Sequence, residues 1–129
     1  MHSTLNLHLP KKAPSHRQLR VGEEVRRIIS SFLMRGDFFT SVPMGSVTVT
    51  EVSISPDLRR AVVYIAPLAR ATDMDDVLTA LKEVAYLMRK QVSKEMRMKF
   101  TPTLQFKYDD SFDQAEHIER LLLKLNPGS

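Results

Sequence analysis

The sequence of 129 residues contains no cysteine and only four glycines. Without cysteine, the chain has neither a disulfide framework nor a thiolate metal site. The glycines are well separated, which excludes the Walker-type loop and the GxGxxG motif that bind nucleotide phosphates. No apolar run approaches the length of a membrane-spanning helix. The composition is that of an ordinary soluble globular protein, and the length suggests one domain.

Residues of the kinds that carry out catalysis are present, but they do not form catalytic patterns. The four histidines lack the spacing of metal ligands: His2, His8, His16 and His117. Ser55 and Asp57 have no histidine partner and are expected to form a turn. Asp109 and Asp110 precede a predicted helix, where capping explains them better than acid–base or magnesium chemistry. We therefore predict that the protein is not an enzyme and uses no cofactor and no metal.

The first residues differ in composition from the rest. Residues 1–14 are rich in proline, serine and lysine, and they lack the basic start and apolar core of a signal peptide. We expect a flexible tail over 1–14, one folded domain over 15–125 and a short tail over 126–129. A cytoplasmic location is the simplest expectation.

Charge is spread unevenly along the chain, whose formal net charge is +4. Residues 1–107 hold 17 Lys and Arg against 10 Asp and Glu, a net of +7, and residues 108–129 hold two against five, a net of −3. A basic body with an acidic end favours a polyanionic partner. An ordinary solvated surface is the alternative at this stage.

A capping box opens the first predicted helix. Ser15 and Gln18 have the spacing at which each side chain satisfies a free backbone N–H of the other residue. Gly36 is a favourable C-terminal stop, so we predict a helix between these positions. Six apolar positions recur at helical spacing and are expected to face the core: Leu19, Val25, Ile28, Ile29, Phe32 and Leu33.

Two strands rich in β-branched residues follow. In 47–55 the apolar residues change parity, which predicts a β-bulge near Thr50 and Glu51. The tetrapeptide SPDL at 55–58 predicts a tight turn, so the two strands must pair antiparallel. Strand 59–67 is apolar on both parities, which predicts an inner strand that is covered on both faces or nearly so.

A long helix, a third strand and a short helix complete the predicted domain. The long helix is expected over 73–99, and Pro102 is expected to stop it. Residues 103–109 alternate apolar and polar side chains, which predicts a strand that can lie parallel to a neighbour after the helical crossover. Ser111 and Gln114 predict a capping box for the C-terminal helix. The expected fold class is α+β, with helices on one face of a three-stranded mixed sheet.

The most informative charges lie on the second half of the long helix. Six positive and two negative side chains occur between Lys82 and Lys99. At about 100° per residue, three cations cluster opposite the apolar stripe: Lys90, Lys94 and Arg97. Arg89 lies at the edge of this cluster. This arrangement suits a phosphate backbone, although a solubilising outer face would also be basic.

Three segments, in this order, are typical of one known family. They are SISPDLRRAVVYIAPL (53–68), VLTALKEVAYLMRKQVSKEMRMKFTPTLQFKYDDSF (77–112) and HIERLLLKL (117–125). Over nearly its whole length the chain therefore resembles the ribosome-binding factor A family. The resemblance implies that residues 15–125 form an RNA-binding domain with a type-II KH-like fold and no enzymatic activity.

The resemblance also implies a partner and a pathway. Members of the family bind the free small ribosomal subunit and its rRNA during late assembly and help to mature the 5′ end of that rRNA. They are cytoplasmic, are linked to growth in the cold, and depend functionally on an assembly GTPase that helps to release them. A monomer is expected, and no membrane is involved.

KH domains grip nucleotides with a GXXG loop between two helices, and the family has an Ala-x-Gly kink in its place. The matching triplet here is Ala85-Tyr86-Leu87, which has the alanine but not the glycine. A straight helix over 73–99 would be about 40 Å long, too long for a compact chain of this size. We therefore predict a helix–kink–helix near residue 85, with Leu87 buried, that presents a basic second half-helix to rRNA.

The predicted phosphate contacts are Arg89, Lys90, Lys94, Arg97 and Lys99, joined by Arg17, Arg20 and Arg27 if the first helix shares their surface. The alternative hypothesis is a protein-interaction adapter. It would use the apolar loop 36–46, with Phe38, Phe39 and Met44, or the acidic C-terminal helix. A DNA-binding KH-like module is a third hypothesis, against which the missing GXXG loop argues.

Overall fold

The computed structural model of the chain describes residues 13–35, 47–68 and 72–125. Predictions for the tail 1–12, the loop 36–46 and the tail 126–129 therefore fall outside the described residues. The predicted α+β fold with a three-stranded mixed sheet is confirmed. The elements follow in the predicted order: α2 (His16–Arg35), β1 (Val47–Ile54), β2 (Arg60–Pro67), α3 (Met74–Met96), β3 (Thr103–Tyr108) and α4 (Ser111–Leu125).

Helix α2 begins with the predicted capping box. The backbone N of Ser15 donates to Oε1 of Gln18 at 2.9 Å, and the backbone N of Gln18 donates to Oγ of Ser15 at 3.1 Å. Nε2 of Gln18 also donates to the carbonyl oxygen of Ile54 at 2.9 Å, which ties α2 to the end of β1. The predicted core positions are buried except Leu19, which is 59% exposed. Leu19 lies at the edge of the buried face, because its neighbour Gln18 is the residue that points at β1.

Strands β1 and β2 form an antiparallel hairpin, and β3 pairs parallel with β2, which is therefore central. The register shifts between Val49 and Glu51, which confirms the predicted bulge. The predicted turn is also present, since the backbone N of Leu58 donates to the carbonyl oxygen of Ser55 at 2.8 Å. Leu58 has a φ of 62°, so a leucine occupies the left-handed conformation that glycine adopts most easily.

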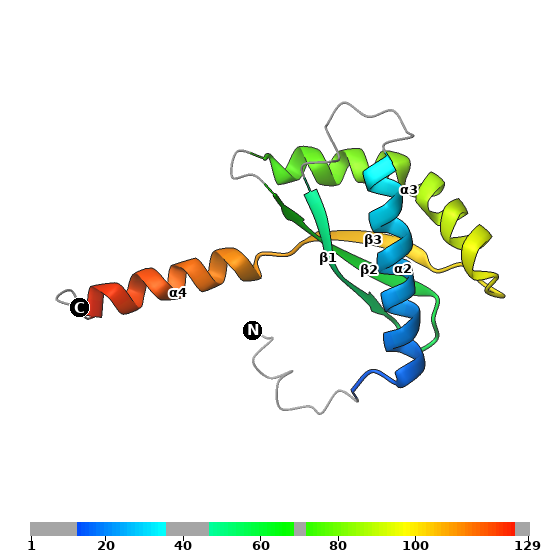
Figure 1. Cartoon of the computed structure of the whole chain (residues 1–129), viewed down its shortest axis with the longest axis horizontal. Coiled ribbons are helices and arrows are strands. Elements are labelled where there is room, and N and C mark those ends of the chain that lie inside the picture. Colours follow the sequence, from blue (N-terminus) through cyan, green and yellow to red (C-terminus); the bar gives the residue numbers. More distant parts are fainter. Residues whose placement is uncertain (1–12, 36–46, 69–71, 126–129) are drawn as a thin grey trace.

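Helices α2 and α3 cover the same face of the sheet (Figure 1). On this face the β2 residues Ala61, Val63 and Ile65 are fully buried. Val62 and Tyr64 point to the other face and are only half-buried. The predicted inner strand is thus confirmed, but only its first face is fully buried, and the second face is partly covered. Among the described residues, both large helices lie on the first face.

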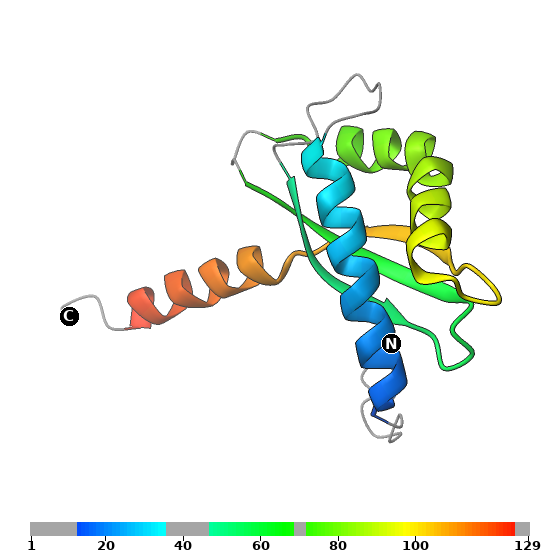
Figure 2. The same cartoon turned by 45° about the vertical axis from the view of Figure 1, so that its right-hand side comes forward.

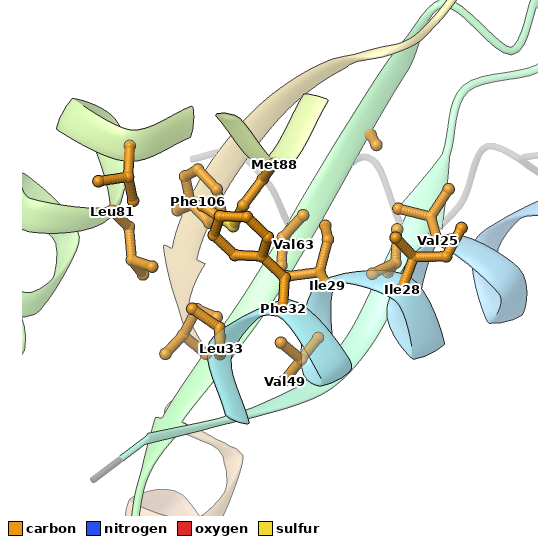
Figure 3. Close-up of a cluster of buried hydrophobic side chains, with 14 of the residues drawn as sticks. Val25, Ile28, Ile29, Phe32, Leu33, Val49, Val63, Leu81, Met88 and Phe106 are labelled. Carbon is orange, nitrogen blue, oxygen red and sulfur yellow. The ribbon is translucent and has the colours of Figure 1, made fainter. Parts of the chain in front are cut away.

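One cluster of apolar side chains joins α2, α3 and the sheet (Figure 3). Phe32 of α2, Met88 of α3 and Phe106 of β3 belong to it, and none is more than 7% exposed. Burying a side chain of this size stabilises the fold by roughly 1.5–3 kcal/mol. The covered face of the sheet is thus the main source of stability and fixes where both helices lie.

Helix α3 starts at the cap Asp73, whose carboxylate accepts hydrogen bonds from the backbone N of Asp75 and Asp76. It is a single α-helix as far as Met96, and its ribbon changes direction part-way along (Figure 2). Leu87 packs against the core as predicted, but it is half-buried rather than buried. The bend itself is present, while its assignment to residues 85–87 stays a prediction.

The end of α3 differs from the prediction. Arg97 takes φ 52° and ψ 37° as the C-cap, and its backbone N donates to the carbonyl oxygen of Ser93 at 3.3 Å. The helix therefore ends before Lys99, and the left-handed residue terminates it rather than Pro102. Pro102 is fully buried and lies at the end of the loop 97–102, which leads into β3.

Helix α4 extends away from the body of the molecule (Figures 1 and 2). Its described side chains are exposed, apart from the half-buried Glu116. Oδ1 of Asp109 accepts hydrogen bonds from the backbone N and Oγ of Ser111, at 3.0 and 2.6 Å, and the carbonyl oxygen of Asp110 accepts from the backbone N of Gln114. The capping role expected for the two aspartates is confirmed. The predicted Ser111–Gln114 box does not form, because Ser111 is already the first helical residue.

Helix α2 crosses β1 at close range at Gly22. A Cβ atom at this position would lie 2.6 Å from the carbonyl oxygen of Val52 and 3.4 Å from Cγ1 of Ile54. A backbone oxygen in a paired strand has little freedom to move, so a side chain fits here only if the helix shifts. Glycine is therefore what allows α2 to lie this close to the sheet.

Replacing Gly22 with alanine is expected to destabilise the protein by about 1–3 kcal/mol, because the added methyl group forces α2 away from β1. This is the reverse of the usual effect in a helix, where alanine is favoured over glycine by about 1 kcal/mol. Urea unfolding measures the change. Ser31→Ala, at an exposed position of the same helix, is the control and should leave the midpoint unchanged or raise it. A G22A variant at least as stable as the wild type would contradict the close packing.

Candidate nucleic-acid interface

The second half of α3 has an apolar face and a basic face. Met88 and Val92 are fully buried, while Lys90 and Lys94 are exposed. The two lysines are four residues apart, so they lie on the same side of the helix, one turn from each other. The structure thus has the basic helix face that the sequence indicates, and its contact with phosphate remains a prediction.

Arg89 has a structural contact that the sequence did not indicate. Its Nη2 donates to the carbonyl oxygen of Thr101 at 2.9 Å. This hydrogen bond ties α3 to the loop 97–102. A guanidinium group has five N–H donors, so Arg89 can hold the loop and keep donors for a phosphate.

Arg17, Arg97 and Lys99 line one pocket. The pocket forms where the start of α2, the turn between β1 and β2 and the loop 97–102 come together. Figure 2 shows these segments, in blue, green and yellow, at the same lower right end of the body. The structure therefore brings together three of the predicted phosphate contacts from segments far apart in the sequence.

One carboxylate, that of Asp57, also lines the pocket. Its Oδ1 accepts hydrogen bonds from Oγ of Ser55 at 2.6 Å and from the backbone N of Arg59 at 3.1 Å. These bonds hold the pKa of Asp57 below its ordinary value, and the bond from Ser55 has the larger effect. The charges of Arg60 and Arg59 lower the pKa further. The carboxylate of Asp57 is thus ionised and hydrogen-bonded within the turn. The pocket is lined by this one anion and by the three cations Arg17, Arg97 and Lys99.

Arg20 and Arg27 are exposed on α2 but do not line the pocket. Their spacing from Arg17 puts them on one side of the helix. They carry positive charge along α2 away from the pocket, with the exposed Glu24 between them on the same side. Arg26 differs from them, because it is paired with Glu23. That hydrogen bond lowers the pKa of Glu23 and raises that of Arg26.

Arg59 and Phe100 were not predicted as site residues from the sequence. Cζ of Arg59 lies 4.6 Å from the centre of the Phe100 ring, and Nζ of Lys99 lies 5.7 Å from it. Phe100 is nevertheless 52% exposed and lines the pocket. An aromatic residue directly after a basic segment was the only available signal, and its contact with Arg59 depends on the tertiary structure.

Other kinds of site find no support in the part of the chain that the structure describes. There, no group of three or more His, Cys, Asp or Glu residues is arranged to hold a metal ion. No helix among the same residues is long and apolar enough to cross a membrane. The basic surface and its pocket are the strongest candidates for a functional site in these residues.

The sequence model of the ribosome-binding factor A family matches residues 17–122. The chain belongs to the ribosome-binding factor A family. Ribosome-binding factor A of Rhodospirillum rubrum is 45% identical over 112 residues, which make up 86% of this chain and 68% of that protein. Ribosome-binding factor A of Parvibaculum lavamentivorans is 43% identical over 121 residues, which make up 93% of this chain and 86% of that protein.

Solved structures with the name ribosome-binding factor A have a similar fold. The solution NMR structure of a putative ribosome-binding factor A from Thermotoga maritima has a TM-score of 0.65 and 20% identity, covering 78% of this chain and 94% of that one. The crystal structure of the Thermus thermophilus protein has a TM-score of 0.60 and 18% identity, covering 70% of this chain and 94% of that one.

A homology model of the Thermus thermophilus ribosome-binding factor A, fitted into a cryo-EM map of its complex with the 30S subunit, has a TM-score of 0.54. Its identity is 17%, and the match covers 69% of this chain and 91% of that one. At such identities the likeness establishes the fold. The sequence matches to ribosome-binding factor A, a family of assembly factors that are not enzymes, confirm the resemblance and the expectation of a non-enzymatic protein.

Replacing Arg89 with methionine is expected to loosen the loop 97–102, because the bond to Thr101 is lost while the apolar stem of the side chain is kept. A hydrogen bond of this kind contributes about 1 kcal/mol. Amide hydrogen exchange in the loop should become faster. Lys90→Met, at the exposed neighbouring position, is the control and should leave exchange in the loop unchanged. Unaltered loop protection in R89M would show that the bond does not anchor the loop.

Proposed function

We propose that this protein is a ribosome assembly factor that binds the free small ribosomal subunit and its rRNA during late maturation. The observation that carries the proposal is the basic surface formed by Lys90 and Lys94 of α3 beside the pocket cations Arg17, Arg97 and Lys99, in a member of the ribosome-binding factor A family. Cations held on a folded framework contact the phosphate backbone and fix the register of the complex without reading sequence.

A factor without catalytic groups acts through the free energy of binding. It favours whichever rRNA conformation it binds more tightly, by as much as its affinities for the two conformations differ. We propose that the conformation favoured here is one in which the 5′ end of the small-subunit rRNA can be matured. The same mechanism would matter more in the cold, where misfolded rRNA rearranges slowly.

Release is the second requirement of such a factor. A partner that binds preferentially to the factor-free conformation of the subunit lowers the affinity for the factor. We propose that an assembly GTPase supplies this coupling. The protein is proposed to act in the cytoplasm as a monomer.

The adapter hypothesis keeps one specific observation in its favour. Helix α4 projects from the body and leaves apolar side chains exposed, among them Ile118 at 56% and Leu121 at 46%. An adapter that used α4 would bind a protein in a salt-insensitive way and would have no affinity for rRNA. The loop residues named for the same role, Phe38, Phe39 and Met44, lie outside the described residues.

Reversing two charges tests the proposed function. Lys90→Glu with Lys94→Glu is expected to weaken co-sedimentation with purified small subunits by roughly tenfold or more and to lower the slope of log affinity against log salt by about two. Lys107→Glu with Lys124→Glu, on β3 and α4, changes the net charge by the same amount. This control is expected to retain most of the binding, and the thermal stability of all three proteins should be similar.

Equal binding by the Lys90/Lys94 variant and the wild type would remove α3 from the interface. Salt-insensitive binding of the wild type, or no binding to small subunits, would instead favour the adapter.

A further inference from the structure

Phe100 is an exposed phenylalanine that lines a pocket and contacts an arginine. Exposed apolar residues are common on proteins, but this ring lines a pocket and carries the guanidinium of Arg59 over it, with 4.6 Å between Cζ and the ring centre. About half of the residue stays exposed. Aromatic rings and arginine planes are the surfaces on which proteins stack unpaired bases.

The charges around the ring suit a phosphate. Arg17, Arg97 and Lys99 line the same pocket as Phe100. The carboxylate of Asp57 opposes them, but it already accepts two hydrogen bonds within its own turn. An aromatic platform beside cations is the combination that binds a nucleotide through its base and its phosphate together.

Backbone strain is concentrated at this pocket. Leu58 with φ 62° and Arg97 with φ 52° are the non-glycine residues in the left-handed region among those that the structure describes. Both line the pocket. Such conformations cost free energy for residues with a side chain, and they gather at binding sites where the surrounding structure imposes them.

Hydrogen bonds fix the walls of the pocket relative to one another. The side chain of Gln18 ties the start of α2 to β1. The backbone N of Thr103 donates to the carbonyl oxygen of Arg59 at 2.9 Å, which joins the start of β3 to the β1–β2 turn. The bond from Arg89 holds the loop between them. A pocket whose walls are already in place loses little entropy when a ligand enters.

We propose that this pocket binds an unpaired nucleotide of an RNA strand, with the base stacked on Phe100 beside Arg59 and the phosphate held by Arg17, Arg97 and Lys99. The inference rests on the proposed function and deepens it. The basic face of α3 recognises phosphate in any RNA, whereas a stacking pocket requires a base that is free to leave its helix. The protein therefore prefers a single-stranded or bulged segment at this point of its interface.

The test measures the affinity of the full-length protein for two labelled RNAs. One is an oligoribonucleotide of about eight unpaired nucleotides, and the other is a duplex of the same length. Phe100→Leu keeps an apolar side chain but removes the ring, and is expected to weaken binding of the unpaired strand about tenfold. Binding of the duplex should not change. Phe100→Trp is expected to restore binding, because indole also stacks. Met34→Ala, at an apolar position of α2 that is 86% exposed, is the control and should bind as the wild type does.

Arg97→Gly separates binding from folding. Glycine relieves the left-handed strain at the helix end, so the midpoint of thermal unfolding should rise or stay the same while the affinity for the unpaired strand falls. A loss of both stability and affinity would show that Arg97 acts only on the fold.

Several results would overturn the inference. One is that F100L binds the unpaired strand as tightly as the wild type does. Another is that F100L loses as much affinity for the duplex as for the unpaired strand. A third is that an acidic peptide or a free mononucleotide competes as well as the unpaired strand does. A wild type without measurable affinity for the unpaired strand at about 50 mM salt would also overturn it. The proposed function fails separately, if the wild type does not bind small subunits. If the wild type binds small subunits but F100L binds the unpaired strand as the wild type does, only the proposal for the pocket is contradicted.

Discussion

The sheet buries one of its faces beneath two helices, and the placement of the residues proposed to contact RNA depends on this constraint. Ala61, Val63 and Ile65 of the central strand are fully enclosed by α2 and α3, while no described helix lies over the opposite face. Gly22 lets α2 lie close against β1, and the buried Met88 and Val92 hold α3 against the same core. The outward side of α3 then carries its lysines, and the end of α3 comes to lie next to the start of α2.

This arrangement explains how a small protein of a non-enzymatic family would bind a large polyanion in the way proposed. The lysines of α3 and the arginines of α2 project from helices that the core holds in place, so they offer charge at fixed positions. The pocket at the end of α3 adds an aromatic ring among cations. The proposed phosphate contacts would give affinity that depends on salt, and a stacked base would give a preference for unpaired RNA.

Local chemistry made much of the fold predictable. The Ser15–Gln18 box, the bulge before Glu51 and the turn at 55–58 each follow from a few neighbouring residues, and the structure confirms all three. The errors arose where tertiary context decides. Leu19 is exposed because its neighbour Gln18 makes the contact with β1 at the start of α2. The end of α3 depends on a left-handed arginine that no propensity predicts. The pocket joins three distant segments, so the pairing of Arg59 with Phe100 could not be read from spacing.

The central claim is that a basic surface, positioned by this one-sided core, attaches the protein to the free small ribosomal subunit. Gradient sedimentation of cell extract at low and high salt tests it most directly. The account predicts that at low salt the protein travels with free small subunits and is absent from translating ribosomes, and that at high salt it remains at the top of the gradient. Sedimentation with translating ribosomes, or an association with small subunits that is unaffected by salt, would contradict it.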